Sequence, residues 1–323
     1  MTGSPRIGAS VAIGSTSVHL TAAVLSRGGL RVVADESVLL GLGRVVEAHG
    51  GIEGEARRAL VGTLALFREA AMRLGATDLT IVATEPLRRA GNHLALRDEI
   101  LAATGRPVHV LSHEEEAWLA LFGVLRGRRP AVETLVVDIG GGSTEYVVAR
   151  REGPPAAFGL RVGAAGLTHA VVRHDPPTED EIATLREEAR RRVAAAEDVA
   201  PRRAILVGGT ATNLLRIVPE AGARGVIDAR VLGEAFAVLR GETAASLAER
   251  CIIRVERARI LPGGAAIVEA MLARYGLRAG RVSEASVREG VILAVARAGD
   301  AWRERLQALV GGRAGGGPGA RSR

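Results

Sequence analysis

The sequence predicts an α/β protein made of two similar halves that face each other across a cleft. Three observations predict this class. Strand-like runs alternate with amphipathic helical runs along most of the 323 residues. Each half opens with a strand, a glycine turn and a second strand, at 13–18 (IGSTSV) and at 139–145 (IGGGSTE). A polar segment at 126–130 (RGRRP) separates the halves. We therefore expect domains over 1–126 and 127–308 and a disordered tail over 309–323, where apolar residues are scarce.

The first half begins with alternating apolar and small side chains at 7–25, which predict strand, turn and strand. Apolar residues recur at helical spacing over 53–74 and predict an amphipathic helix. The other expected elements are strands at 30–40, 79–85 and 108–112, a helix at 92–103, and a helix opening at Glu114.

The second half repeats the opening pattern, with expected strands at 134–139, 144–150 and 156–163. A helix over 178–196 follows Pro176 and Pro177, with Thr178 as its N-cap. A strand at 204–207 leads into another glycine turn, and further helices fill 228–275.

Composition excludes several classes of function. Every one of the 43 basic residues is arginine, so mechanisms that need a lysine, including the Walker phosphate loop and Schiff-base chemistry, are excluded. Aromatic residues are only 2% of the chain, which argues against a surface that stacks nucleic-acid bases. The single cysteine, Cys251, offers neither a disulfide nor a thiolate metal cluster. Without a signal peptide or a membrane-length apolar run, we expect a cytoplasmic protein that binds neither membrane nor nucleic acid.

The second glycine turn carries the strongest chemical signal, within 136–148 (VVDIGGGSTEYVV). Successive backbone N–H groups in such a turn form a concave site for an anion. A strand follows the glycines, whereas the dinucleotide-binding fingerprint continues into a helix. Asp138 and Glu145 flank the turn and would repel a phosphate unless a divalent cation lay between them.

Six segments together carry a family resemblance. They are VVDIGGGSTE at 136–145, IGSTSVHL at 13–20, VATEPLRRAGN at 82–92, LSHEEEAWLALFGV at 111–124, VGGTATNLL at 207–215 and SEASVREGVIL at 283–293. In order and spacing, over roughly 7–295, the chain resembles the exopolyphosphatase and guanosine pentaphosphate phosphatase family. That family belongs to the superfamily of actin, sugar kinases and heat-shock chaperones. The resemblance implies two ribonuclease H-like (actin-like ATPase) domains around a central cleft.

The resemblance also implies roles for individual residues. Glu115 would activate the attacking water and Arg88 would clamp the phosphate, while Asp138 and Glu145 would hold Mg²⁺ or another divalent cation. The residues expected to bind phosphate are Gly14, Ser15, Ser17, Gly140, Gly141, Gly142, Ser143, Thr144, Gly208, Gly209 and Thr210. Arg288 and Glu289 are expected to be structural. The implied activity is hydrolysis that releases phosphate from inorganic polyphosphate or guanosine pentaphosphate. A homodimer is common in such families.

One position departs from the family pattern. Ala12 stands where the family has an aspartate that binds metal or water, and a methyl group does neither. A second hypothesis is therefore a regulator that binds polyphosphate or an alarmone without turnover. A third is an ATP-dependent sugar or acetate-type kinase, against which the glutamate-rich segment at 114–116 and the lack of sugar-binding insertions argue.

Overall fold

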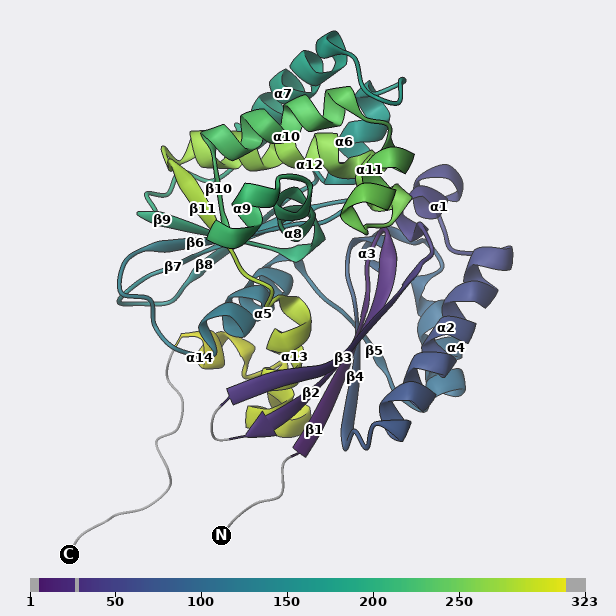
Figure 1. Ribbon diagram of the computed structural model, residues 1–323. Helices are drawn as coiled ribbons and strands as arrows, with labels where there is room; N and C mark the ends of the chain where they lie inside the picture. The colour runs from purple at the N-terminus through teal and green to yellow at the C-terminus, as the bar shows by residue number, and fades with distance from the viewer. Residues whose placement is uncertain (1–5, 27–28, 312–323) are drawn as a thin grey trace, which may run out of the picture.

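The computed structural model describes residues 6–26 and 29–311 of the chain. It consists of two lobes, each built on one twisted β-sheet with helices against it (Figure 1). The sheet near the N-terminus lies below and the larger second lobe above in that view. The predicted α/β class with two similar halves is confirmed.

The first sheet has the strand order β3-β2-β1-β4-β5. Its strands are β1 (Arg6–Ile13), β2 (Ser17–Ser26), β3 (Gly29–Leu39), β4 (Asp78–Ala83) and β5 (Val108–Val110). The first three are antiparallel neighbours, and β4 joins β1 in parallel, as does β5 with β4. The helices of this lobe are α1 (Leu42–His49), α2 (Gly54–Arg73), α3 (Glu85–Arg89) and α4 (His93–Thr104). Buried side chains of α2 and α4, such as Leu64 and Ile100, form one core with Val11 of β1.

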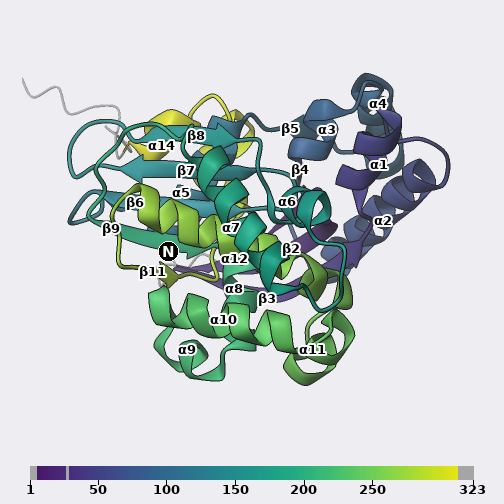
Figure 2. The ribbon, with the colours of Figure 1, turned by 90° about the horizontal axis from the view of Figure 1, so that it is seen from above.

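The second sheet has the order β10-β11-β9-β6-β7-β8. Its strands are β6 (Thr134–Ile139), β7 (Thr144–Ala149), β8 (Ala156–Leu160), β9 (Arg203–Val207), β10 (Val226–Asp228) and β11 (Ala279–Val282). The helices on its outer side are α6 (Ala164–Val171), α7 (Glu179–Val193), α8 (Gly208–Ile217), α9 (Pro219–Arg224), α10 (Ala229–Gly241), α11 (Ala244–Cys251) and α12 (Val255–Arg274). Seen from above, α12 and α7 lie over this sheet (Figure 2). The central strand pairs β1–β2 and β6–β7 are therefore equivalent antiparallel hairpins in the two lobes.

Two helices pack between the sheets. α5 (His113–Leu125) contacts β7 and β8 of the second sheet, whereas α13 (Val287–Ala298) contacts β1 and β2 of the first. They cross where glycine allows their backbones to touch: a Cβ on Gly290 would lie 2.0 Å from the Leu119 carbonyl oxygen, and one on Gly123 would lie 2.4 Å from the Ser286 carbonyl oxygen. The chain after residue 286 thus returns from the second lobe to the first sheet.

The domain limits of 1–126 and 127–308 stay a prediction, although α13 shows that the second half contributes to the first lobe. A short helix η1 (Gly299–Trp302) and α14 (Leu306–Val310) end the described chain. The tail expected to be disordered from residue 309 thus begins inside α14, and 312–323 lie outside the described residues. Within the described chain, the helices are all too short or too polar to span a membrane.

Candidate active site between the lobes

The two predicted glycine turns have the same local geometry. In the first, the N–H of Gly14 donates to the carbonyl of Ser17 at 3.0 Å; in the second, the N–H of Gly140 donates to the carbonyl of Ser143 at 2.9 Å. Each turn closes a hairpin of its sheet, β1–β2 and β6–β7. The short internal repeat in the sequence therefore corresponds to a structural repeat, and it brings the two turns face to face.

A cavity of about 420 Å³ lies between the turns. Predicted residues that line it are Gly14, Ser15, Ser17, Gly140, Gly141, Gly142, Ser143, Asp138, Gly208 and Gly209. Gly208 begins α8 with a φ of +82°, and a Cβ there would lie 2.4 Å from Oδ1 of Asp138. The expected third glycine turn is therefore the start of a helix, and glycine is needed because its backbone lies against a carboxylate.

Two predicted phosphate ligands do not line this cavity. Thr144 is fully buried and its hydroxyl donates to the carbonyl of Val162 at 2.6 Å. The hydroxyl of Thr210 donates to the carbonyl of Ile139 at 2.8 Å. Both hydroxyls therefore hold backbone next to the second turn.

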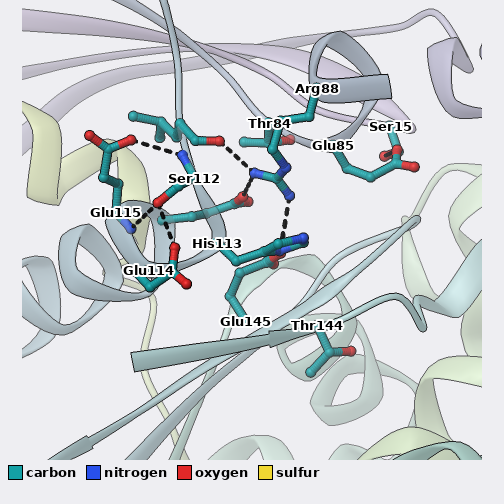
Figure 3. Close-up of polar contacts among 12 residues, drawn as sticks. Ser15, Thr84, Glu85, Arg88, Ser112, His113, Glu114, Glu115, Thr144 and Glu145 are labelled. Carbon is teal, nitrogen blue, oxygen red and sulfur yellow. Dashed lines mark hydrogen bonds and ion pairs between the residues drawn. The ribbon is translucent and has the colours of Figure 1, made fainter. Parts of the chain in front are cut away.

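A cluster of charged side chains lies behind the turns (Figure 3). Arg88 of α3 donates to Glu116 at 2.8 Å and to the carbonyl of Leu111 at 2.8 Å, and its other nitrogen lies 3.4 Å from Glu145. Nδ1 of His113 lies 2.7 Å from the same oxygen of Glu145. Arg88, predicted to clamp the phosphate, does not line the cavity; it lies behind the turns and links two carboxylates from α5 and β7.

The structure brings Glu116, and not Glu115, to the cavity. The carboxylate of Glu115 accepts the backbone N–H of Ser112 at 2.8 Å, completing the capping box of α5, and it also binds Arg303 at 2.8 Å. In Figure 3 it points away from Arg88 and Glu145. Of the two adjacent glutamates, the structure therefore places Glu116, and not the predicted Glu115, in the cavity wall. The sequence offered three consecutive glutamates, and burial distinguishes Glu116 from the other two.

Burial changes the proton affinity of these carboxyl groups. It raises the pKa of Glu145 to about 8 and the pKa of Asp138 to about 6. Burial and the nearby Glu145 raise the pKa of Glu116 well above its ordinary value, which Arg88 only partly opposes. Burial and Arg88 lower the pKa of His113. Burial thus favours the uncharged forms of all four groups.

The departure at Ala12 has a structural counterpart. Asp138 and Glu145 are cross-strand partners on β6 and β7, and the equivalent partners on β1 and β2 are Ala12 and His19. Ala12 lines the cavity, so the cavity wall carries a methyl group where the family pattern would put a carboxylate. The acidic pair of the second lobe is thus matched by an uncharged pair in the first, because burial and three arginines lower the pKa of His19 to about 3.

Arginines surround His19 on this side of the cavity. Arg257 donates to the hydroxyl of Ser17, which lies 2.7 Å from Nε2 of His19. Arg288 lies 3.3 Å from Nδ1 of His19 and bonds to Asp35. Arg288, expected to be structural, therefore also lines the cavity. The arginines that line the cavity come from α8, the start of α12 and α13, whereas its acidic residues come from both lobes.

The carboxylates at the cavity can hold a divalent cation only together with oxygen ligands from water and substrate. The described residues contain no group of three or more His, Cys, Asp or Glu arranged to hold a metal. Mg²⁺, however, is commonly held by one or two carboxylates together with water and phosphate oxygens. Asp138 suits this role, because it lines the cavity and its carboxylate accepts no hydrogen bond from the described residues. Glu145 is already bound by His113 and Arg88.

One further carboxylate was missed by sequence reasoning. Glu85 is buried, accepts from the hydroxyl of Ser15 at 2.7 Å and from Arg89 at 2.7 Å. It also lies against Gly142, where a Cβ would be 2.7 Å from its Oε2. The sequence predicts it at the end of a strand over 79–85, whereas in the structure it begins α3, before Pro86.

Comparison with known proteins decides the family. The profile of the Ppx/GppA phosphatase family matches residues 22–298. The chain belongs to the Ppx/GppA phosphatase family. Among curated relatives, exopolyphosphatase 2 of Mycobacterium tuberculosis is 30% identical over 313 residues, covering 89% of this chain and 98% of that protein. Exopolyphosphatase 1 of the same organism is 28% identical over 294 residues, covering 87% and 86%.

Solved structures agree with this assignment. The Ppx/GppA family member of Aquifex aeolicus matches with a TM-score of 0.77 and 25% identity, covering 91% of this chain and 98% of that one. An exopolyphosphatase from Cytophaga hutchinsonii matches with a TM-score of 0.78 and 22% identity over 90% and 97% of the two chains, which supports the fold. The predicted family and the predicted actin-like two-domain fold class are confirmed.

Proposed function

We propose that this Ppx/GppA protein is an exopolyphosphatase, a phosphohydrolase that releases the terminal phosphate of inorganic polyphosphate. The observation that carries the proposal is the buried pair of Glu116 and Arg88 beside two facing glycine turns. The turns supply backbone N–H groups for the phosphoryl oxygens. The curated relatives named exopolyphosphatase support the choice of reaction.

Glu116 is proposed as the general base. Its carboxylate lines the cavity, and Arg88 holds it there through a hydrogen bond of 2.8 Å. The oxygen of a water molecule forms the new bond to the terminal phosphorus, while its proton passes to Glu116. The bond between that phosphorus and the bridging oxygen breaks, and the shortened chain leaves with the bridging oxygen.

Mg²⁺ is proposed as the cofactor, held by Asp138 with water and substrate oxygens. When bound, it would neutralise charge on the phosphoryl oxygens. Asp138 keeps a carboxylate free for it, and Ser143 and Gly140 line the same cavity. Arg257 and Ser17 on the opposite wall would bind phosphate directly, where Ala12 removes the negative charge.

The test is a phosphate-release assay with purified protein, comparing polyphosphate and guanosine pentaphosphate with and without Mg²⁺. We expect release from polyphosphate that stops when the metal is chelated. Release from guanosine pentaphosphate alone would move the assignment to the other substrate of the family. If neither substrate releases phosphate, the proposal that this chain is a phosphohydrolase is rejected.

A second candidate is the regulator that binds polyphosphate or an alarmone without turnover, favoured by the place of Ala12 in the cavity wall. Ala12→Asp separates the two. If the chain is an enzyme, the variant should change turnover little, because Asp138 and Glu116 remain. If the wild type instead releases no phosphate and the Ala12→Asp variant does, the chain is a regulator that lost turnover with Ala12.

A further inference from the structure

His19 is a polar residue of the cavity wall that the proposed mechanism does not use. It lies on β2 and occupies the position that Glu145 occupies in the equivalent hairpin of the second lobe. Its ring has a partner on each side: the Ser17 hydroxyl lies 2.7 Å from Nε2, and a guanidinium nitrogen of Arg288 lies 3.3 Å from Nδ1. The directions of these two hydrogen bonds determine what the ring does to Ser17.

The partners of the ring fix its tautomer. Arg288 has only N–H donors, so Nδ1 must accept the hydrogen bond between them. A neutral imidazole carries one proton, which therefore resides on Nε2 and is donated to the oxygen of Ser17. The ring is neutral because burial and the charges of Arg288, Arg257 and Arg254 lower its pKa to about 3. His19 is thus a hydrogen-bond donor to Ser17 at neutral pH.

Both lone pairs of the Ser17 hydroxyl are then occupied. Arg257 donates to this oxygen at 2.5 Å and lies farther, 3.4 Å, from Nε2 of His19. A hydroxyl has two lone pairs and one proton, so only its O–H is left to bind a further group. Within the described chain, this hydroxyl makes hydrogen bonds with Arg257 and His19 alone, and Ser17 lines the cavity. The O–H is therefore available to an acceptor inside the cavity.

The orientation of the ring is held by a second element of the first sheet and by α13. The guanidinium nitrogen of Arg288 that faces His19 also donates to the carboxylate of Asp35 on β3. Arg288 lies on α13, which packs against β1 and β2. Asp35, Arg288, His19 and Ser17 thus form a chain of hydrogen bonds across β3, α13 and β2. Donors held in this way lose little orientational freedom when a ligand binds.

We propose that His19 is a positioning residue that makes the Ser17 hydroxyl an obligatory donor to a phosphoryl oxygen, an inference that rests on the proposed function. An ionised phosphoryl oxygen accepts hydrogen bonds and has no proton to donate, so it matches this hydroxyl. The same arrangement excludes the oxygen of Ser17 as a cation ligand, because metal ligation needs a free lone pair. The wall around Ala12 therefore binds the anion itself, and the cation belongs at Asp138.

A double-mutant cycle in binding tests this inference. Ser17→Ala, His19→Leu and the double variant are made in Glu116→Gln protein, and calorimetry measures the affinity for tripolyphosphate with Mg²⁺. Ser17→Ala should weaken binding about 10- to 100-fold, as expected for a hydrogen bond to a charged group, and His19→Leu about tenfold. The double variant should bind no more weakly than Ser17→Ala, because His19 acts through that hydroxyl. Additive losses would overturn the inference.

Replacement by glutamine separates this role from packing. The amide of Gln keeps an N–H for Ser17 and an oxygen that accepts from Arg288, so His19→Gln should bind within about threefold of its parent. A loss as large as that of His19→Leu would contradict the role of the ring as a donor. His49→Leu is the matched control, because His49 is exposed at the end of α1 and lies outside the cavity. This control should leave the affinity unchanged.

NMR of the wild type tests the tautomer without altering the site. In protein labelled with ¹⁵N-histidine, the His19 signals are those absent from the spectrum of His19→Gln. They should show a proton on Nε2 and none on Nδ1 at pH 7; an Nδ1–H tautomer or an imidazolium would overturn the inference. If binding follows the cycle but no substrate releases phosphate, only the proposed enzyme activity fails. If phosphate is released while the losses are additive, only the role of His19 fails.

Discussion

At the scale of single residues, the site depends on which of three consecutive glutamates faces the cleft. Adjacent residues on an α-helix point about 100° apart, since 3.6 residues complete a turn. Glu115 therefore faces Arg303 and the helix start, while Glu116 faces Arg88. A local sequence pattern carries no information on how α5 is rotated about its axis against β7 and β8.

This difference gives the sharpest mutational prediction. Glu116→Gln should lower kcat for polyphosphate by about 10²–10⁴-fold, because the amide cannot take the proton from water. Glu115→Gln should keep kcat within a few-fold, since its carboxylate binds Arg303 and the backbone of Ser112. Phosphate release under saturating substrate measures both. An inactive Glu115→Gln variant together with an active Glu116→Gln variant would assign the base to Glu115 instead.

At the scale of elements, the crossing of α5 and α13 determines how the two lobes are joined. Gly123 and Gly290 let the helix backbones touch, and side chains such as Leu119 and Val291 bury the surrounding surface. Glycine inside a helix lowers helix stability by about 0.5–1 kcal/mol relative to alanine, so the close approach must offset this loss.

Gly290→Ala should therefore destabilise the protein by about 1–3 kcal/mol or more, because the new methyl would overlap the Leu119 carbonyl. The free energy of unfolding in denaturant measures it. Gly62→Ala is the matched control: Gly62 lies inside α2 and its added methyl would meet nothing within 4 Å. That variant should be stabilised by roughly 0.5–1 kcal/mol. Equal effects of the two changes would contradict the crossing described above.

The start of α7 provides a pH-dependent prediction. Burial alone would raise the pKa of Glu181, but the N–H groups of Thr178 and Arg173 and the ring of His174 donate to it and lower the pKa to about 2. Because the folded pKa is below the ordinary value of 4.5, the stabilisation is present above pH 4.5 and is lost as the pH falls toward 2. Glu181→Gln should lower the free energy of unfolding by about 1 kcal/mol at pH 7.

The difference in the free energy of unfolding between the wild type and Glu181→Gln should shrink below pH 4.5. Denaturant unfolding at several pH values measures this difference. Asp180→Asn, one residue earlier in the first turn of α7, is the control. Its side chain makes no hydrogen bond with the described residues, so it should have a smaller effect. A Glu181→Gln cost that stays constant from pH 7 to pH 3 would contradict the proposed origin.

At the scale of the whole molecule, the two lobes are connected across the cavity by more than the helix crossing. Arg254 donates to the carbonyl of Ser37, and Arg257 donates to the hydroxyl of Ser17. Both arginines come from the start of the second lobe's α12 and both acceptors from the first sheet. A ligand between the turns adds further contacts to both lobes and should stabilise them together.

Glu116→Gln protein should accordingly show a higher Tm with tripolyphosphate and Mg²⁺, by an amount that grows with ligand concentration. At 100 times Kd the linkage corresponds to about 2.7 kcal/mol of added stability. Chelation of Mg²⁺ should remove most of the increase if Asp138 holds the cation. Sulfate at matched ionic strength is the control, and an equal increase with sulfate would indicate a general salt effect.

Much of the fold could be predicted because its signals are local. Alternating apolar residues predicted the hairpins at both glycine turns, and Thr178 after Pro176 and Pro177 predicted the start of α7. These patterns depend on neighbours along the chain, which the sequence contains. The return of α13 to the first sheet was not foreseen, because a helix pattern does not specify which sheet it packs on.

For the candidate site, the sequence by itself determined the two glycine turns, the nearby Asp138 and Arg88, and the missing carboxylate at Ala12. The turns and Asp138 follow from residue types within short segments, whereas Arg88 and the missing carboxylate at Ala12 follow from the family resemblance. Only the tertiary structure decided that Glu116, and not Glu115, lines the cavity and that the hydroxyls of Thr144 and Thr210 donate to backbone carbonyls. The physical reason is that side-chain direction, burial and long-range proximity arise only when separate segments pack together.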